Sequence, residues 1–159
     1  MNKALLTVFL LFMSVVSFCQ TKYYKGEWSK CDGSYLFKAF VKLDFKGNSI
    51  TGEILWTVLS ADSFDASSVT FYKNKLNKSG VEIIAGIYNP QTKDLNFRGV
   101  SKVDPDGVIG TDIYSLKISS DDKVIYGKTV SNNKSNSYLY AMLVANAEKE
   151  YNTAREKIK

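Results

Sequence analysis

The sequence predicts an all-β protein: an antiparallel up-and-down meander of about eight strands that closes into a barrel, with a short C-terminal helix. Apolar and polar residues alternate in consecutive segments, and the connections between these segments are short and rich in turn-forming residues. Short connections join antiparallel neighbours, and closure removes the two exposed edges that an open sheet would leave. A two-sheet sandwich is the alternative architecture.

Residues 35–45 give the clearest strand signal, because large apolar residues occupy every second position. After a turn at residues 46–48, residues 50–58 repeat the alternation, so the two segments form a hairpin. Matching the two apolar faces fixes the register. That register pairs Val41 with Ile54, Ala39 with Trp56, and Lys42 with Glu53.

Further strands are expected on both sides of this hairpin, each bounded by turn residues. They cover residues 22–30, 69–76, 81–88, 95–103, 112–119, 124–130 and 138–144, and the signal is weakest for 69–76. Glycines inside the strands allow bends or leave room for bulky neighbours; they are Gly52, Gly86, Gly99 and Gly127. From residue 145 an apolar period of three to four residues predicts an amphipathic helix, with Ala147, Tyr151, Ala154 and Ile158 on one face.

Residues 1–19 resemble an export signal, with a basic start, a short apolar run and small residues before a cut at Gln20. We therefore expect a signal peptide at 1–19, a single β-barrel domain at 20–159, and a secreted or periplasmic protein. The alternative is a lipoprotein signal, in which Cys19 is acylated and anchors the chain to a membrane. After signal removal no remaining segment is apolar enough for a transmembrane span.

Charge and cysteine content limit the function classes. The net charge is +5, but the lysines are spread along the chain, so we expect no nucleic-acid partner. Removal of the signal leaves Cys31 as a single thiol, so no intramolecular disulfide is expected. A buried structural role is favoured for Cys31 over a cross-link or a reactive group.

Histidine is absent, which removes the commonest general base and zinc ligand. No HExxH, CxxC, GxSxG or phosphate-binding loop is present either, so we expect no enzyme, no metal and no cofactor. Paired carboxylates remain the one catalytic option, with Glu53 and Glu82 as candidates. We expect each to form a cross-strand ion pair instead, Glu53 with Lys42 and Glu82 with Lys102. The second pair follows if the apolar faces of its hairpin are matched, with Ile83, Ala85 and Ile87 against Phe97, Gly99 and Ser101.

Two loops raise further questions. Three acids between residues 104 and 112, namely Asp104, Asp106 and Asp112, either surround a calcium ion or belong to an ordinary Pro-Asp-Gly turn. Residues 60–80 contain Phe64, Phe71 and Tyr72, and form either a rim over a barrel mouth or a plain loop followed by an edge strand.

Gly26-Glu27-Trp28 resembles the G-x-W motif of lipocalins, and Thr111-Asp112-Ile113-Tyr114 is similar to their T-D-Y with one residue inserted. Avidin-type barrels also begin with G-x-W, and small exported bacterial β-barrels look alike. The lipocalin resemblance implies a calyx for a small apolar molecule, with Trp28 closing its base. The arginine that covers this tryptophan in lipocalins has no counterpart here.

We therefore expect a non-enzymatic barrel that binds a small apolar or amphipathic ligand, with Trp28, Phe37, Trp56 and Tyr114 as the binding residues. The alternative is an envelope-associated interaction or inhibitor module with a solid core and no ligand cavity, acting on a protein partner. Phe40 and Leu55, which fall on the charged face of the first hairpin, favour this alternative.

Overall fold

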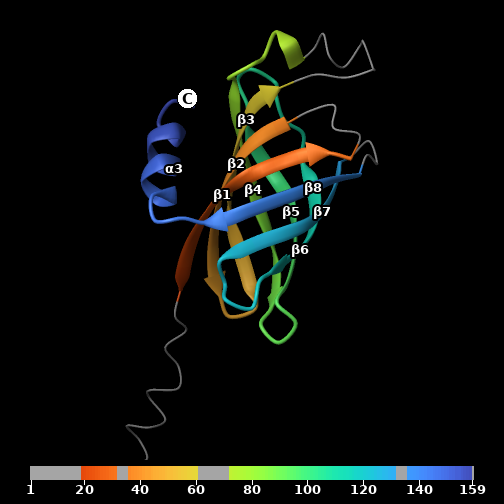
Figure 1. Cartoon of the computed structure of the whole chain (residues 1–159), viewed down its shortest axis with the longest axis vertical. Helices are drawn as coiled ribbons and strands as arrows, with labels where there is room; N and C mark the ends of the chain where they lie inside the picture. Colours follow the sequence, from red (N-terminus) through yellow and green to blue (C-terminus); the bar gives the residue numbers. More distant parts are fainter. Residues whose placement is uncertain (1–18, 32–35, 61–71, 132–135, 159) are drawn as a thin grey trace, which may run out of the picture.

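The computed structural model describes residues 19–31, 36–60, 72–131 and 136–158, and these form an eight-stranded antiparallel meander closed into a barrel (Figure 1). The predicted fold class is confirmed. Closure comes from β1, which pairs with both β2 and β8. The strands are β1 (Gln20–Lys30), β2 (Leu36–Lys46), β3 (Ser49–Ser60), β4 (Ser79–Asn89), β5 (Asp94–Val103), β6 (Asp112–Ile118), β7 (Val124–Ser131) and β8 (Asn136–Leu143), followed by the helix α3 (Ala147–Arg155).

The three pairs predicted for the first hairpin, between β2 and β3, are confirmed in register. The predicted strand at residues 69–76 is wrong within its described part, because residues 72–73 make a helical turn and residues 74–77 a turn. Phe64 and Phe71 lie outside the described residues, as does the predicted signal segment up to residue 18. No helix in the described ranges is long and apolar enough to cross a membrane.

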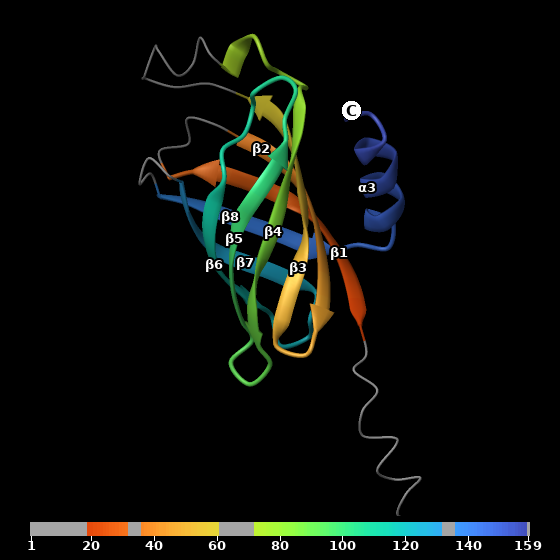
Figure 2. The same ribbon diagram turned by 180° about the vertical axis from the view of Figure 1, so that it is seen from behind.

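The two ends of the barrel differ, and we refer to them as the upper end and the lower end. The upper end of Figure 1 is where β1 finishes, β2 begins and the loop at residues 104–111 joins β5 to β6. The lower end carries Gln20 and the tight turns at residues 47–48, 90–93 and 119–123. Figure 2, from behind, shows that β6 lies on the side of the barrel away from α3.

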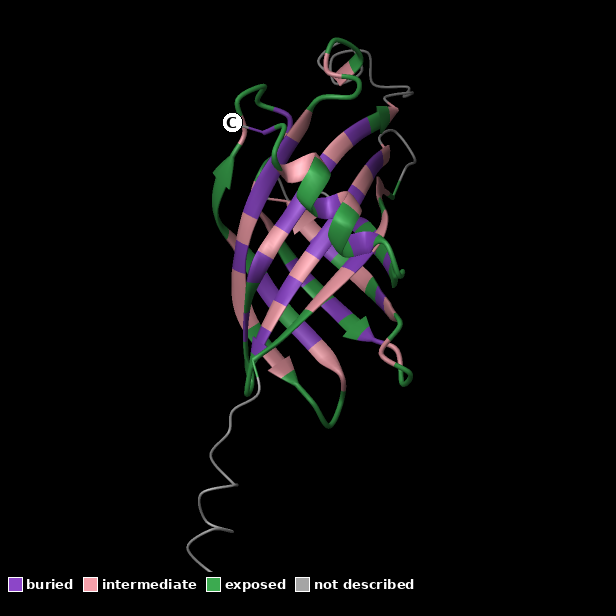
Figure 3. Ribbon diagram, turned by 90° about the vertical axis from the view of Figure 1, so that its left-hand side faces the viewer, coloured by how far each residue is buried: buried purple, intermediate pink, exposed green. Residues whose placement is uncertain are grey.

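Inward-facing side chains form one continuous core, because each strand turns every second residue inward. Figure 3 shows this alternation as purple and pink bands along the strands behind α3. The core extends from Phe45 and Ile50 near the lower end to Phe37 and Trp56 at the upper end. Side chains therefore fill most of the barrel interior.

A second, smaller core lies outside the barrel, between the sheet and α3. Phe40 and Leu55, expected to be exposed, are buried there against Tyr151 and Ile158. Tyr151 also donates a hydrogen bond to Glu53. The expectation of an exposed apolar pair on the first hairpin is thus wrong, because the apolar face of the predicted helix covers it.

Candidate functional site

Aromatic rings close the upper end of the barrel. Trp28 lies edge-on to Phe37 at 5.3 Å and to Trp56 at 6.2 Å between ring centroids. Tyr72 packs edge-on against Phe37 at 5.6 Å. Three of the four predicted ligand-binding residues therefore lie together, and Phe37 and Trp56 are almost fully buried. They contact one another as a packed layer, as aromatic side chains do in protein cores.

The polar atoms behind this layer belong to β1, β7 and β8. The Trp28 indole N–H donates to the Thr129 hydroxyl at 2.7 Å. Ser137 is paired with Thr129 across β7 and β8, and its buried hydroxyl has no hydrogen-bond partner within the described ranges. On this side of the upper end, then, one buried polar atom is unsatisfied.

Glu82, on β4, unexpectedly places its carboxyl group inside the upper end of the barrel. Only 1% of this residue is exposed, and three donors surround its carboxyl group. The Trp56 indole N–H donates to Oε2 at 3.2 Å and the Asp112 backbone N–H donates to Oε1 at 2.8 Å. The Tyr114 hydroxyl donates to Oε2 as well. Tyr114, the fourth predicted binding residue, is thereby joined to the other three.

Burial governs the acidity of this cluster. It raises the pKa of Glu82 to about 7, although the hydrogen bonds from Tyr114, Asp112 and Trp56 act in the opposite direction. Burial also raises the pKa of Asp112 to about 6. The pKa of the Tyr114 hydroxyl lies well above its ordinary value, first because it is buried and then because Glu82 and Asp112 are close. The cluster thus favours protonated groups near neutral pH.

The prediction for the β4 face was wrong. Ile83 and Ala85 were expected to face inward, whereas Glu82 and Ile84 do so, and Ile87 is 63% exposed. Glu82 and Lys102 are register partners as predicted, but the Lys102 ammonium bonds Asp104 at 3.0 Å. The expected ion pair between Glu82 and Lys102 does not form, because the Glu82 side chain enters the barrel.

Gly99 on β5 makes room for the Glu82 carboxyl group. A Cβ atom at Gly99 would lie 2.0 Å from Glu82 Oε1 and 2.9 Å from the Cβ of Thr111. This glycine in the predicted strand was the sequence signal that could have revealed Glu82, since a strand glycine often marks a close approach.

The expected pair between Glu53 and Lys42 is also replaced. Arg155 of α3 donates to Glu53 at 2.9 Å, and the Lys42 ammonium lies 3.4 Å from Asp44 instead. Burial acts to raise the pKa of Glu53, but the bonds from Tyr151 and Arg155 outweigh it and hold that pKa below its ordinary value. Glu53 therefore anchors the helix to the sheet.

The three acids considered for calcium point to separate partners. Asp104 accepts the backbone N–H groups of Val108 and Ile109 at 2.7 and 3.0 Å, which closes the loop on itself. Asp106 pairs with a lysine at 3.4 Å, and the backbone of Asp112 joins the Glu82 cluster. Within the described ranges no group of three potential metal ligands comes together.

The lower end is open. A cavity of about 600 Å³ lies there. Phe45 and Tyr88 form an edge-on aromatic pair in its wall, with ring centroids 5.2 Å apart, and the Lys22 ammonium lies 5.7 Å from the Phe45 ring centroid. The lining residues are Cys19, Gln20, Lys22, Phe45, Gly47, Tyr88 and Asp122. None of the four predicted binding residues is among them.

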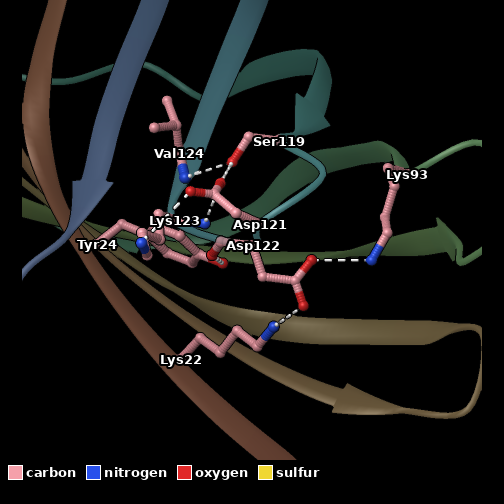
Figure 4. Close-up of polar contacts among 8 residues, drawn as sticks. All are labelled: Lys22, Tyr24, Lys93, Ser119, Asp121, Asp122, Lys123 and Val124. Atoms are coloured by element: carbon pink, nitrogen blue, oxygen red, sulfur yellow. Dashed lines mark hydrogen bonds and ion pairs between the residues drawn. The ribbon is translucent and has the colours of Figure 1, made fainter.

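Asp122 joins three segments across this mouth, as Figure 4 shows. Its carboxylate accepts from Lys22 of β1 at 3.0 Å and from Lys93 of the 90–93 turn at 2.9 Å. Its backbone carbonyl accepts from the buried Tyr24 hydroxyl at 3.3 Å. The turn that carries Asp122 is fixed by Ser119, whose backbone carbonyl accepts from the Asp122 N–H at 2.9 Å. The two lysines lower the pKa of Asp122, so it is ionised.

A second cleft of about 440 Å³ runs between α3 and β2. Phe40 lies in it, with the ammonium groups of Lys25 and Lys38 at 5.8 and 5.1 Å from the ring centroid. Lys149 and Lys157 of the C-terminal segment also line it. Its aromatic surface is thus already in contact with cations of the chain.

The chain matches no family model, no curated protein and no solved structure. Its closed eight-stranded barrel is consistent with a lipocalin-like architecture. The two segments that resemble lipocalin motifs both lie at the upper end, where Trp28 and Tyr114 are linked through Trp56 and Glu82.

Proposed function

We propose that this protein is a non-enzymatic barrel that binds a small amphipathic ligand in the cavity at its lower end. The observation that supports this proposal is the combination of an open cavity of about 600 Å³ with an aromatic pair and a lysine in its wall. Ligand sites commonly measure roughly 300–1,000 Å³ and combine apolar walls with a few polar groups that orient the ligand.

A site at the mouth also agrees with the packed interior. Core side chains between Phe45 and Trp56 fill the barrel interior, so a ligand would bind at the rim and not along the barrel axis. Phe45 and Tyr88 would hold its apolar part, while Lys22 and Asp122 would orient its polar part. Trp28, Phe37, Trp56 and Tyr114 then have the role of a scaffold that closes the other end.

Binding of N-phenyl-1-naphthylamine, a neutral fluorescent amphiphile, tests the proposal. We expect Tyr88→Ala to weaken its binding by about twofold to tenfold, since an aromatic contact contributes roughly 0.5–1.5 kcal/mol. Tyr140→Ala is the matched control, because Tyr140 is 53% exposed on the outer face of β8. No saturable binding by the wild type, or equal losses in both variants, would contradict the proposal.

One observation favours a second function, a protein interface on the outer face of β7 and β8. Tyr126 is paired with Tyr140 across these strands, and both are about half exposed, as is Tyr138. Contiguous exposed aromatics are typical of interaction surfaces. A double variant, Tyr126→Ser with Tyr140→Ser, should then abolish an association seen by sedimentation. A wild-type protein that sediments as a monomer, both by itself and after mixing with an envelope extract, contradicts this function.

Export remains part of the proposal. The first residue of the mature chain determines whether the cavity faces solvent or a membrane. Cys19 lines the cavity and β1 begins at Gln20. An intact mass that begins at Gln20 supports a secreted or periplasmic barrel. Acyl chains on Cys19 would instead hold the lower-end cavity against a membrane.

A further inference from the structure

The charges around the lower-end cavity do not balance. Three acids near the mouth each have a lysine partner of their own. These pairs are Lys42 with Asp44 at 3.4 Å, Lys117 with Asp94 at 3.3 Å, and Lys123 with Asp121 at 3.6 Å. Asp122, in contrast, is shared by two lysines, Lys22 and Lys93. This group of three carries a net positive charge beside the cavity.

The two ammonium groups retain hydrogen-bonding capacity. Each lysine has three N–H donors; the Asp122 carboxylate takes one from Lys22 and one from Lys93, and Lys93 also interacts with the Tyr88 hydroxyl. Lys22 is also the less hydrated of the two, with 13% of its side chain exposed against 35% for Lys93. A partly buried cation interacts more strongly with an added anion than a hydrated one does.

Asp122 holds Lys22, which lines the cavity, and Lys93, which bonds the same carboxylate from outside the lining. Because its turn is fixed by Ser119 and by the Tyr24 hydroxyl, the carboxylate holds the two ammonium groups, one on each of its oxygens (Figure 4). A ligand anion therefore does not have to order two flexible lysine side chains, which reduces the entropic cost of binding.

We infer that the ligand of the lower-end cavity is an amphipathic anion, whose carboxylate, sulfonate or phosphate group accepts a hydrogen bond from Lys22 and is attracted by the neighbouring charge of Lys93, while its apolar part packs on Phe45 and Tyr88. This inference rests on the proposed function of the cavity. It adds the sign of the ligand charge and the two residues that recognise it.

A pair of fluorescent probes separates the inference from the proposed function. N-phenyl-1-naphthylamine reports the apolar site, and 8-anilinonaphthalene-1-sulfonate has the same rings with one sulfonate added. We expect Lys22→Gln and Lys93→Gln each to weaken binding of the sulfonate by about twofold to fivefold, the usual range for one partly exposed charge pair. The neutral probe should bind these variants as it binds the wild type.

Asp122→Asn should change the affinity for the sulfonate probe in the opposite direction. Asp122 has a φ of 60°, which asparagine adopts readily, so the turn is retained while one negative charge is lost. Its sulfonate affinity should rise by about twofold to fivefold, because removing the competing negative charge outweighs the weaker hold on the two lysines. Lys149→Gln, which removes a lysine from the cleft under α3, is the matched control and should change neither probe.

The outcomes are distinguishable. If the neutral probe binds and the lysine substitutions leave the sulfonate affinity unchanged, or weaken both probes equally, the anion inference is wrong and the cavity proposal stands. If Lys149→Gln weakens the sulfonate as much as Lys22→Gln does, the anion is bound elsewhere and the inference is likewise overturned. If neither probe binds, the proposed function itself fails.

Discussion

The two ends of this barrel use similar residue types in opposite ways. At the upper end, aromatic rings pack on one another and a buried carboxyl group, Glu82, takes hydrogen bonds from three donors. At the lower end, the aromatic pair of Phe45 and Tyr88 borders a cavity, and the carboxylate of Asp122 is partly hydrated. The upper end fixes its groups, whereas the lower end leaves donors that a ligand can use.

The contrast shows how a small closed barrel can separate stability from binding. A buried polar group is stable only while its partners stay in place, so the Glu82 cluster resists rearrangement. The ion pairs around Asp122 leave lysine N–H donors unused, so a ligand anion can bind there without breaking those pairs. Substitutions at the two ends should therefore have very different effects.

The largest expected effect is at the upper end. Trp56→Ala should lower the free energy of unfolding by about 3–5 kcal/mol, because it removes a buried ring and leaves Glu82 without one donor. Urea unfolding followed by circular dichroism measures this. Trp56→Phe, which keeps a ring but not the indole N–H, should cost less. A loss below about 1 kcal/mol for Trp56→Ala would show that the upper end is not the stabilising end.

The next effect is a pH dependence due to Glu82. Its pKa is about 7 in the folded protein against an ordinary value of 4.5, so the folded state binds the extra proton between these values. The contribution of Glu82 to stability is therefore greatest below about pH 4.5, decreases as the pH rises toward 7, and levels off above it. Asp112, with its pKa raised to about 6, acts in the same direction.

Urea unfolding at about pH 5 and pH 8.5 tests this, with an expected loss of about 3–4 kcal/mol at the higher pH from Glu82 and Asp112 together. The chain has no histidine, so few other groups titrate in that window. Glu82→Gln should remove most of the slope and leave the smaller part from Asp112. A wild type and a Glu82→Gln variant with parallel pH profiles would mean that Glu82 is ionised throughout.

A third effect tests the fit between Glu82 and Gly99. Gly99→Ala should cost about 2 kcal/mol, because its Cβ would overlap the carboxyl group and disturb the bonds that hold it. In a Glu82→Ala background the same substitution should cost less, since the closest overlap is gone and only the contact with the Thr111 Cβ at 2.9 Å remains. Equal costs of Gly99→Ala in both backgrounds, measured by urea unfolding, would rule out this coupling.

Much of the fold was predictable because it depends on local alternation and turns. The first hairpin has an apolar face and a charged face, and its register is therefore determined within a few residues of sequence. The C-terminal helix was predictable from the spacing of Ala147 and Tyr151, both buried; it ends at Arg155, and the predicted face residue Ile158 is buried beyond its end. The strand face that the helix covers was not predictable, because a helix can cover any outer face of a barrel.

The candidate site was harder to predict, for two physical reasons. Ile83 and Ala85 look like core residues and Glu82 does not, and a bulge between Ile83 and Ile84 shifts the register with β5. The lower-end cavity combines residues far apart in sequence, such as Lys22 and Asp122, which only barrel closure brings together. Cys31 was expected to be buried and is exposed, since β1 ends one residue before it.

The smallest expected effect on stability belongs to the lower end. Tyr88→Ala should lower the free energy of unfolding by about 1 kcal/mol or less, because this half-buried side chain loses its edge-on contact with Phe45 and an exposed contact with Lys93, and borders an open cavity. The same urea titration that measures Trp56→Ala provides the comparison. If Tyr88→Ala destabilises the protein as strongly as Trp56→Ala, the lower end is a packed closure like the upper one. A small loss of stability together with weaker probe binding is the combination that a site for ligands requires.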